Sequence, residues 1–520
     1  MLNWFRTALA ALTLTLPVIA GAQPTARLDS GMVRGKIEGA AEVFQGIPFA
    51  QAPVGPLRWR SPQPVAKWSG VRDATAASPA CYQAIVKPWD PYPANFVTDT
   101  AVSEDCLYLN VWRPAAAKRR LPVYVFIHGG AFRGGSGSLA IYDGAKLAAQ
   151  GVVVVTLNYR LGAFGFLAHP ELTREAGTSG NYGILDQIAA LRWVRANIAA
   201  LGGDPANVTI AGESAGAMSV NSLIMSPLAK GLFHRAVSMS GPVLAGPMIP
   251  LVEAERNGVD VAAKVGGGTL DGLRKLSAAQ LLDATRGSPP GSAGPPAFAY
   301  APARDGQVIA GEPVDGFAPV RSDVPLLAGY NSHEMLNDRV RTPAEFEAEV
   351  RRRYGTFAAR FLALYPHAND AEAVASNILL NRDRYMAALV IWGQQRVASS
   401  GAPIHAYLYD HPYPAGPSGK DYGAFHSSAL PYIFGTLTDP ARNFTAADQA
   451  VSRQMQAHWV AFMRTGDPAA AGQAWPRFGP SSTTVMGLGD SHGSRTAVST
   501  PQRLQLFRDY VASGGRIGLI

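Results

Sequence analysis

The chain has 520 residues, of which 47% are hydrophobic, and a formal net charge of +8 at pH 7. Its length is several times that of a typical domain, so it can bury a large core. Lys and Arg are scattered and form no stripe with interleaved aromatic residues, so the composition indicates a solvated basic surface and excludes nucleic acid as a partner. No Cys and His group has metal-ligand spacing, so the sequence predicts no metal and no other cofactor.

The first 22 residues are typical of a secretory signal peptide. Arg6 gives a positive start, residues 8–19 form a short apolar run, and Ala20-Gly21-Ala22 matches the A-x-A cleavage pattern. A membrane anchor is the alternative, but the run is shorter than the ~20 residues that a spanning helix needs, and no other stretch reaches that length. We therefore expect a secreted or periplasmic protein with no membrane span, whose mature chain begins near Gln23.

The chain contains only two cysteines, Cys81 and Cys106. Export would place them in an oxidising environment, which predicts a disulfide that closes a loop over residues 82–105. Two separate buried thiols are the alternative.

Short apolar runs alternate with helical patterns along the mature chain. Seven runs are predicted as strands: residues 107–112, 123–127, 152–158, 208–211, 236–239, 324–329 and 405–409. An apolar stripe from Ile188 to Leu201 has helical spacing and ends at Gly202. The alternation predicts an α/β fold with helices on both sides of a sheet. No linker or repeat divides residues 23–520, so we expect a single domain in which residues 287–296 form a surface loop.

The predicted strand at residues 123–127 is followed by His128-Gly129-Gly130-Ala131-Phe132. Residues without bulk expose consecutive backbone N–H groups beside the carboxyl end of the strand, where they can bind an oxyanion. A plain glycine turn is the alternative for Gly-Gly alone. The nucleophile motif downstream favours an oxyanion hole made by the amides of Gly129, Gly130 and Ala215.

That nucleophile motif is Gly212-Glu213-Ser214-Ala215-Gly216, between an apolar run and a helix-compatible segment. Strand, sharp turn and helix make a nucleophile elbow, which lifts the serine hydroxyl clear of the backbone and requires small neighbours. Gly489-Asp490-Ser491-His492-Gly493 fits the same pattern, but neither a helical run nor a later histidine follows it. We therefore predict Ser214 as the nucleophile and interpret residues 489–493 as a turn.

A serine nucleophile needs a base and an acid that orients the base, and in this fold the order is serine, acid, histidine. Eight histidines follow Ser214. His426 is favoured as the base because it lies on a loop after the predicted strand at residues 405–409, with an aromatic segment behind it. The rivals are His405 and His411, with His458 interpreted as a packed or surface histidine in a helix.

Glu334 is favoured as the acid because it lies just beyond the predicted strand at residues 324–329. A loop at the end of a strand can aim a carboxylate at a histidine. By spacing alone, Asp305, Asp323 and Asp338 remain alternatives.

With these motifs the chain resembles the type B carboxylesterases, the cholinesterase-like branch of the α/β-hydrolases. The likeness runs over nearly the whole mature chain. Besides the two motifs at residues 128–132 and 212–216, its markers are residues 44–50 with 53–55, 103–110, 158–160 and 180–183.

The resemblance implies a Ser-Glu-His triad and the oxyanion donors already named. These roles fall on Ser214, Glu334 and His426, with Gly129, Gly130 and Ala215 as donors. It also implies the Cys81–Cys106 disulfide, an ion pair between Arg58 and Glu104, and a buried second carboxylate at Glu213, whose alternative role is elbow packing. Two departures stand out: Met335 replaces the glycine that usually follows the acid, and Ala429 replaces an acidic residue common three positions after the histidine.

We therefore expect a secreted serine carboxylesterase that acts on small-molecule esters through an acyl-enzyme. Arg133 follows the oxyanion motif and could pair with a carboxylate on an anionic substrate; an outward-facing or protein-paired arginine is the alternative. The competing functions are a non-catalytic binding protein of the same fold and a lipase for long-chain esters.

Overall fold

The computed structural model describes residues 23–115, 119–241, 243–244, 248–286, 300–311, 323–334, 339–470 and 472–518. The predicted signal peptide at residues 1–22 and the predicted loop at residues 287–296 lie outside the described residues, as do Met335 and Asp338. Within the described ranges, no helix is both long enough and apolar enough to cross a membrane.

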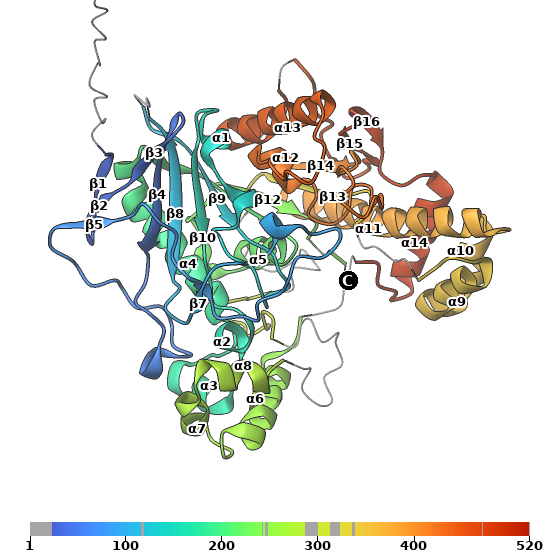
Figure 1. Cartoon of the computed structure of the whole chain (residues 1–520). Helices are drawn as coiled ribbons and strands as arrows, with labels where there is room; N and C mark the ends of the chain where they lie inside the picture. The colour runs from blue at the N-terminus through green and yellow to red at the C-terminus, as the bar shows by residue number, and fades with distance from the viewer. Residues whose placement is uncertain are drawn as a thin grey trace, which may run out of the picture.

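A mixed sheet of 11 strands runs through the described residues (Figure 1). In spatial order its strands are β16 (Gly493–Thr496), β15 (Thr484–Leu488), β14 (Ile404–Tyr409), β13 (Leu326–Asn331), β12 (Arg235–Met239), β11 (Gly203–Glu213), β9 (Leu121–Ile127), β10 (Val153–Leu157), β8 (Tyr108–Pro114), β4 (Ala41–Pro48) and β3 (Lys36–Glu38). The seven predicted strands correspond to β8 through β14, which confirms those predictions.

The centre of the sheet is parallel and its borders are antiparallel. From β15 across to β10 each strand is parallel to its neighbour, whereas β8, β4 and β3 on one side and β16 on the other are antiparallel. Parallel strands present their carboxyl ends at one edge of a sheet, which is where ligands bind in such folds. The segments that follow β9, β11, β13 and β14 therefore meet at that edge.

Helices cover both faces of the sheet. Along β9, Val123, Val125 and Ile127 face one core, while Tyr124 and Phe126 face the other. The first face is covered by α4 (Tyr182–Asn197), α5 (Ala215–Ile224) and α11 (Asp370–Ser400). The second face is covered by α1 (Ala145–Ala148), α12 (Leu430–Phe434) and α13 (Ala446–Thr465). This is the predicted α/β-hydrolase layering.

The remaining helices form two groups, one at the bottom and one at the right of the view in Figure 1. One group contains α2 (Gly162–Phe166), α3 (Pro170–Ala176), α6 (Leu251–Val265), α7 (Leu270–Lys275) and α8 (Ala278–Ala284). The other contains α9 (Pro343–Tyr354), α10 (Ala358–Leu364) and α14 (Pro501–Ala512), packed against α11. Small sheets flank the large one: β1 (Thr25–Leu28), β2 (Gly31–Arg34) and β5 (Val71–Asp73), and separately β6 (Ala80–Cys81) with β7 (Val102–Ser103).

The helix predicted from the apolar stripe between Ile188 and Leu201 is also present. It comprises α4 and a 3₁₀ turn, η4 (Ile198–Leu201), and it ends at Gly202, whose φ of 79° is left-handed. Residues 489–493 form the turn between β15 and β16, as expected.

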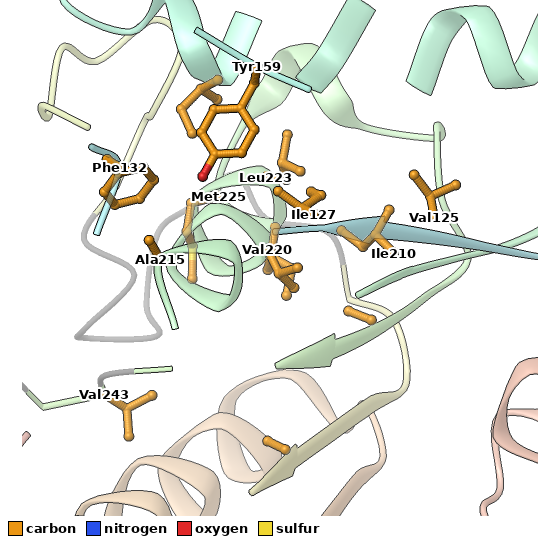
Figure 2. Packing of buried hydrophobic residues seen from close by; sticks show 14 of the residues in the cluster. Val125, Ile127, Phe132, Tyr159, Ile210, Ala215, Val220, Leu223, Met225 and Val243 are labelled. Carbon is orange, nitrogen blue, oxygen red and sulfur yellow. The ribbon is translucent and has the colours of Figure 1, made fainter. Parts of the chain in front are cut away.

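The core beneath the nucleophile motif is fully packed. Figure 2 shows apolar side chains of β9, β11 and α5 meeting there, among them Val125, Ile127, Ile210, Val220 and Leu223. This packing fixes the start of α5 against the sheet, and with it the position of the preceding turn.

Candidate active site

Ser214 is the single residue between β11 and α5. Its φ of 58° and ψ of −123° lie where non-glycine residues are rarely found. A Cβ at Gly212 would lie 2.3 Å from the backbone of Gly216, and one at Gly216 would lie 2.0 Å from the carbonyl oxygen of Ile127. Only glycine fits at either position, so the chain turns sharply and leaves Ser214 partly exposed between buried neighbours. This geometry is that of a nucleophile elbow.

The loop after β9 lies directly beside Ser214. A Cβ at Gly129 would be 3.1 Å from the Ser214 Cβ, so a larger residue would push against the serine. Gly130 is exposed and has φ of 103°, a conformation that strains other residues. Ala215 begins α5, and the first amides of a helix have no intrahelical acceptor. The loop and the helix start thus adjoin the serine from two sides.

His128 holds this loop from within the protein. It is buried, its ring stacks on Tyr159 with centroids 4.5 Å apart, and its Nδ1 lies 2.8 Å from the carbonyl oxygen of Gly129. Burial lowers the pKa of His128 to about 4, so the ring is neutral and donates its Nδ1–H to that carbonyl. His128 is therefore a support for the loop and not a base.

Glu334 lies three residues beyond β13 and is almost completely buried. Its Oε1 accepts hydrogen bonds from the Asn331 amide at 2.6 Å and from the Ser240 hydroxyl at 2.5 Å. Its Oε2 lies 2.5 Å from Nδ1 of His426. The sequence reading missed Ser240, because a serine directly after a strand, here β12, belongs to no motif; only its place between the strands that lead to Ser214 and Glu334 could have pointed to it.

His426 lies on the loop after β14, and its imidazole reaches a carboxylate at each nitrogen. Nδ1 faces Glu334, and Nε2 lies 3.2 Å from Oε1 of Glu213. Glu213 is the last residue of β11 and adjoins Ser214 in the chain. The structure therefore brings together the predicted base, the predicted acid and the second carboxylate at the end of the nucleophile strand.

The loops that carry the acid and the base are joined by hydrogen bonds. Asn331 Nδ2 donates to the carbonyl of Phe425 at 2.6 Å, and the amide of His333 donates to the carbonyl of Ala424 at 3.0 Å. Residues 331–334 and 424–426 thus lie side by side, although 92 residues separate Glu334 from His426.

The two carboxylates decide the proton affinity of His426. Burial lowers the pKa of His426, but the charges of Glu213 and Glu334 and the hydrogen bond to Glu334 outweigh it and raise the pKa to about 9. Burial raises the pKa of Glu213, and the charge of His426 and the hydroxyl of Ser427 oppose that rise. Once His426 has taken a proton, this environment stabilises the imidazolium.

The rival histidines and acids have other surroundings. His405 is buried within β14, and His411 lies between Asp448 and Asp490 at 3.1 and 2.5 Å. His458 is packed inside α13, as expected. Asp305 accepts the Thr178 hydroxyl and nearby backbone amides. None of these contacts involves Glu213, Ser214 or Glu334.

Arg133 is exposed and directly follows residues 128–132, the predicted oxyanion loop. Its Nη2 donates to the carbonyl of Arg286 at 3.0 Å, where the chain leaves α8. The predicted role toward a substrate carboxylate therefore concerns an exposed guanidinium that also binds a backbone carbonyl.

The segment between the two cysteines contacts the loop between β14 and α12 that carries His426, called here the histidine loop. Cys81 and Cys106 form the predicted disulfide. At its base Arg58 binds both oxygens of Glu104 at 2.5 and 2.8 Å, so the predicted ion pair is present. Within the segment, the ring of Tyr92 packs edge-on against Phe425 with centroids 5.3 Å apart. The segment thus contacts the residue next to His426.

The mostly parallel sheet, covered by helices on both faces, and the serine at the end of β11 define an α/β-hydrolase. The model of the Carboxylesterase family matches residues 22–506, so the chain belongs to the carboxylesterase family and is a carboxylic ester hydrolase.

Three comparisons illustrate the likeness. Fumonisin B1 esterase of Sphingopyxis macrogoltabida is 37% identical over 471 residues, which cover 86% of this chain and 84% of the relative. Para-nitrobenzyl esterase of Bacillus subtilis (strain 168) is 37% identical over 469 residues, which cover 86% and 91%. A solved structure of a PNB esterase superposes with a TM-score of 0.76 at 34% identity and covers 93% of this chain and all 100% of its own.

Proposed function

We propose that this protein is a secreted serine carboxylesterase that works through Ser214, His426 and Glu334 and an acyl-enzyme. The observation that carries the proposal is the contact of His426 Nδ1 with the buried Glu334, at 2.5 Å, on loops that adjoin the strained Ser214 turn. Because the acid is buried, hydrogen-bonded and aimed at Nδ1, Nε2 is the nitrogen that can accept the proton of the serine hydroxyl.

In the first half of the reaction, Ser214 Oγ attacks the ester carbonyl carbon and its proton passes to His426 Nε2. The carbonyl oxygen becomes an oxyanion, for which the amides of Gly129, Gly130 and Ala215 are the proposed donors. The intermediate then collapses, the bond to the alkoxy group breaks, and His426 returns the proton to the leaving alcohol.

In the second half, water attacks the acyl-enzyme while His426 accepts its proton. The bond between the acyl carbon and Ser214 Oγ breaks, the proton returns to the serine, and the carboxylic acid leaves. Glu334 holds His426 in the tautomer with the proton on Nδ1, so that Nε2 can accept a proton, and it stabilises the imidazolium formed in each half.

Arg133 supports a preference for esters that also carry a free carboxylate. It directly follows the proposed oxyanion loop and is exposed, and its guanidinium donates to the carbonyl of Arg286 after α8. Charge-assisted bonds from arginine to carboxylates are among the stronger polar contacts. The relative from Sphingopyxis macrogoltabida is named for fumonisin B1, so fumonisin B1 belongs in the substrate panel.

A second candidate is a preference for long-chain esters. Ile85, Val86 and Trp89 of the disulfide segment are each about half exposed, at 56%, 49% and 52%. An apolar surface on a segment that contacts the histidine loop could bind an acyl chain. Activity that rises with acyl length in a p-nitrophenyl ester series would favour this candidate.

Secretion and a single mature domain over residues 23–520 are parts of the same proposal. Secretion is supported by the leader-like first 22 residues and by the Cys81–Cys106 disulfide, since disulfides persist in oxidising compartments.

The test is hydrolysis of p-nitrophenyl butyrate by residues 23–520 and by the Ser214→Ala variant. We expect turnover by the wild type and a loss of about four orders of magnitude or more in the variant. Ser491→Ala is a matched control, because Ser491 occupies the same pentapeptide pattern in the turn after β15, and its activity should equal the wild type. Covalent labelling by a fluorophosphonate should require Ser214 only. A wild type that neither turns over the esters nor takes the label would instead be a binding protein.

A further inference from the structure

Backbone strain in this protein gathers around the proposed site. Besides glycine, the described residues with positive φ are Trp59, Ala131, Phe132, Ser214, Ser240, Leu244 and Ser427. Five of these seven belong to the oxyanion loop, the elbow, the acid pocket or the histidine loop. Strained residues persist where the surrounding contacts hold them, and they cluster at functional sites.

Ser427, directly after His426, has no assigned part in the reaction. Its φ is 73°, which glycine would adopt without strain. Its hydroxyl donates to Oε1 of Glu213 at 2.8 Å, and that same oxygen lies 3.2 Å from Nε2 of His426. The side chain at this strained position therefore reaches the carboxylate that faces the base.

Glu213 is held from two sides. Its Oε2 would lie 3.0 Å from a Cβ on Gly129, so the carboxylate packs against the oxyanion loop while Ser427 binds its other oxygen. Ala429, two residues further along the histidine loop, is buried and brings no polar side-chain atom. The hydroxyl of Ser427 thus ties Glu213 to the histidine loop in addition to the contact of Glu213 with His426 itself.

The other titratable groups that face Glu213 and His426 come from three neighbouring elements and the acid loop. They are Tyr92 of the disulfide segment, Tyr142 of η3 (Ala140–Tyr142), Tyr407 of β14, and Glu334. Burial, with the nearby carboxylates, raises the pKa of each tyrosine above its usual value, so the tyrosines stay neutral. Glu213 and Glu334 are therefore the negative charges that act on His426.

We propose that Ser427 is a positioning residue that keeps the Glu213 carboxylate ionised and aimed at Nε2 of His426, and so sets the proton affinity of the base. The proposal rests on the function proposed above. Without the hydroxyl, the buried Glu213 loses a donor that favours its charged form, so the pKa of Glu213 should rise. A proton bound between His426 and Glu213 should then lie more often on Glu213. The pKa of His426 should then fall.

The test compares Ser427→Ala, Ser427→Gly and Ser427→Thr. The first two remove the hydroxyl, and the glycine variant also removes the strain. Their kcat/KM profiles should have an acid limb displaced to lower pH by about half a unit or more. Threonine keeps the hydroxyl but is β-branched, so its limb should stay in place while its melting temperature falls. The glycine variant should melt no earlier than the wild type.

Two further measurements make the result specific. NMR titration of the His426 ring gives its pKa without turnover, so it decides the proposal even if the wild type proves inactive as an esterase. In a Glu213→Gln background, Ser427→Ala should leave the His426 pKa unchanged, because the carboxylate through which Ser427 acts is gone. The proposal is overturned if the pKa of His426 is unchanged or rises in Ser427→Ala, or if its fall persists without Glu213.

Discussion

The two carboxylates that flank His426 are both buried but have different hydrogen-bond partners. Glu334 binds Ser240, a backbone amide of its own loop and Nδ1 of the imidazole, so both its oxygens are satisfied deep in the protein. Glu213 shares one oxygen between Ser427 and the imidazole, and burial raises its pKa. Three hydrogen-bond contacts thus hold the Glu334 carboxylate, whereas Glu213 is held through one oxygen and burial raises its pKa.

This difference separates two tasks that one histidine must combine. In the proposed mechanism, a carboxylate held by several hydrogen bonds at Nδ1 sets the orientation and tautomer of the ring. A more weakly held charge at Nε2, the side on which the substrate reacts, tunes the pKa without locking the ring in place. Substitutions at the two sites should therefore differ in kind as well as in size.

The largest effect is expected at Glu334. Glu334→Gln keeps the shape but removes the charge and the acceptor that fix the tautomer of His426, so kcat should fall by about three to four orders of magnitude. Steady-state kinetics with p-nitrophenyl butyrate measures this loss. Glu347→Gln, in an exposed surface pair with Arg351, is the control and should match the wild type. A Glu334→Gln variant within tenfold of the wild type would mean that another group orients the base.

Glu213→Gln should alter the pH dependence more than the maximal rate. His426 must be neutral to act as a base, and its pKa is raised to about 9, so wild-type kcat/KM should increase with pH up to that region. Removing the Glu213 charge should lower the pKa of His426 and move this limb to lower pH by about one unit or more. A limb that stays in place would show that Glu213 exerts no charge effect on the base.

The smallest effect is expected at Ser240. Ser240→Ala leaves Glu334 with two of its three contacts, so kcat should fall by about tenfold or less, while unfolding should need less denaturant because a buried hydrogen bond is lost. Ser222→Ala removes a buried hydroxyl from α5, away from the acid, and should change stability alone. Equal kinetic losses in both variants would mean that the Ser240 contact has no special part in holding the acid.

The sequence predicted the strands at the centre of the large sheet but not the strands at its two edges. A continuous apolar run predicted β9, and largely apolar runs predicted β10 and β14, because strands buried on both faces leave such patterns. The short strands β3 and β16 have mixed exposure and escaped detection. The 31-residue α11 carries buried Asp, Arg and Asn among its apolar residues, so it shows no clear stripe.

The same limit applies to the site. Ser214 and the glycines that flank it belong to a local motif. Chain order and strand position favoured His426 but left His405 and His411 as rivals, and the family resemblance then selected His426. Ser240 and Ser427 lie outside any motif, since what distinguishes them is a contact with a residue 94 or 214 positions away and a backbone conformation that folding imposes.

The hydrogen bonds from Asn331 and His333 to the histidine loop have a mechanical consequence. They join the loops of the proposed acid and base, so we expect a displacement of either loop to carry the other with it. The reaction geometry then depends on how the unit formed by these loops stands relative to a second one, formed by the elbow and the oxyanion loop. Mutations that shift the two units against each other should slow catalysis, even when every residue of the site is intact.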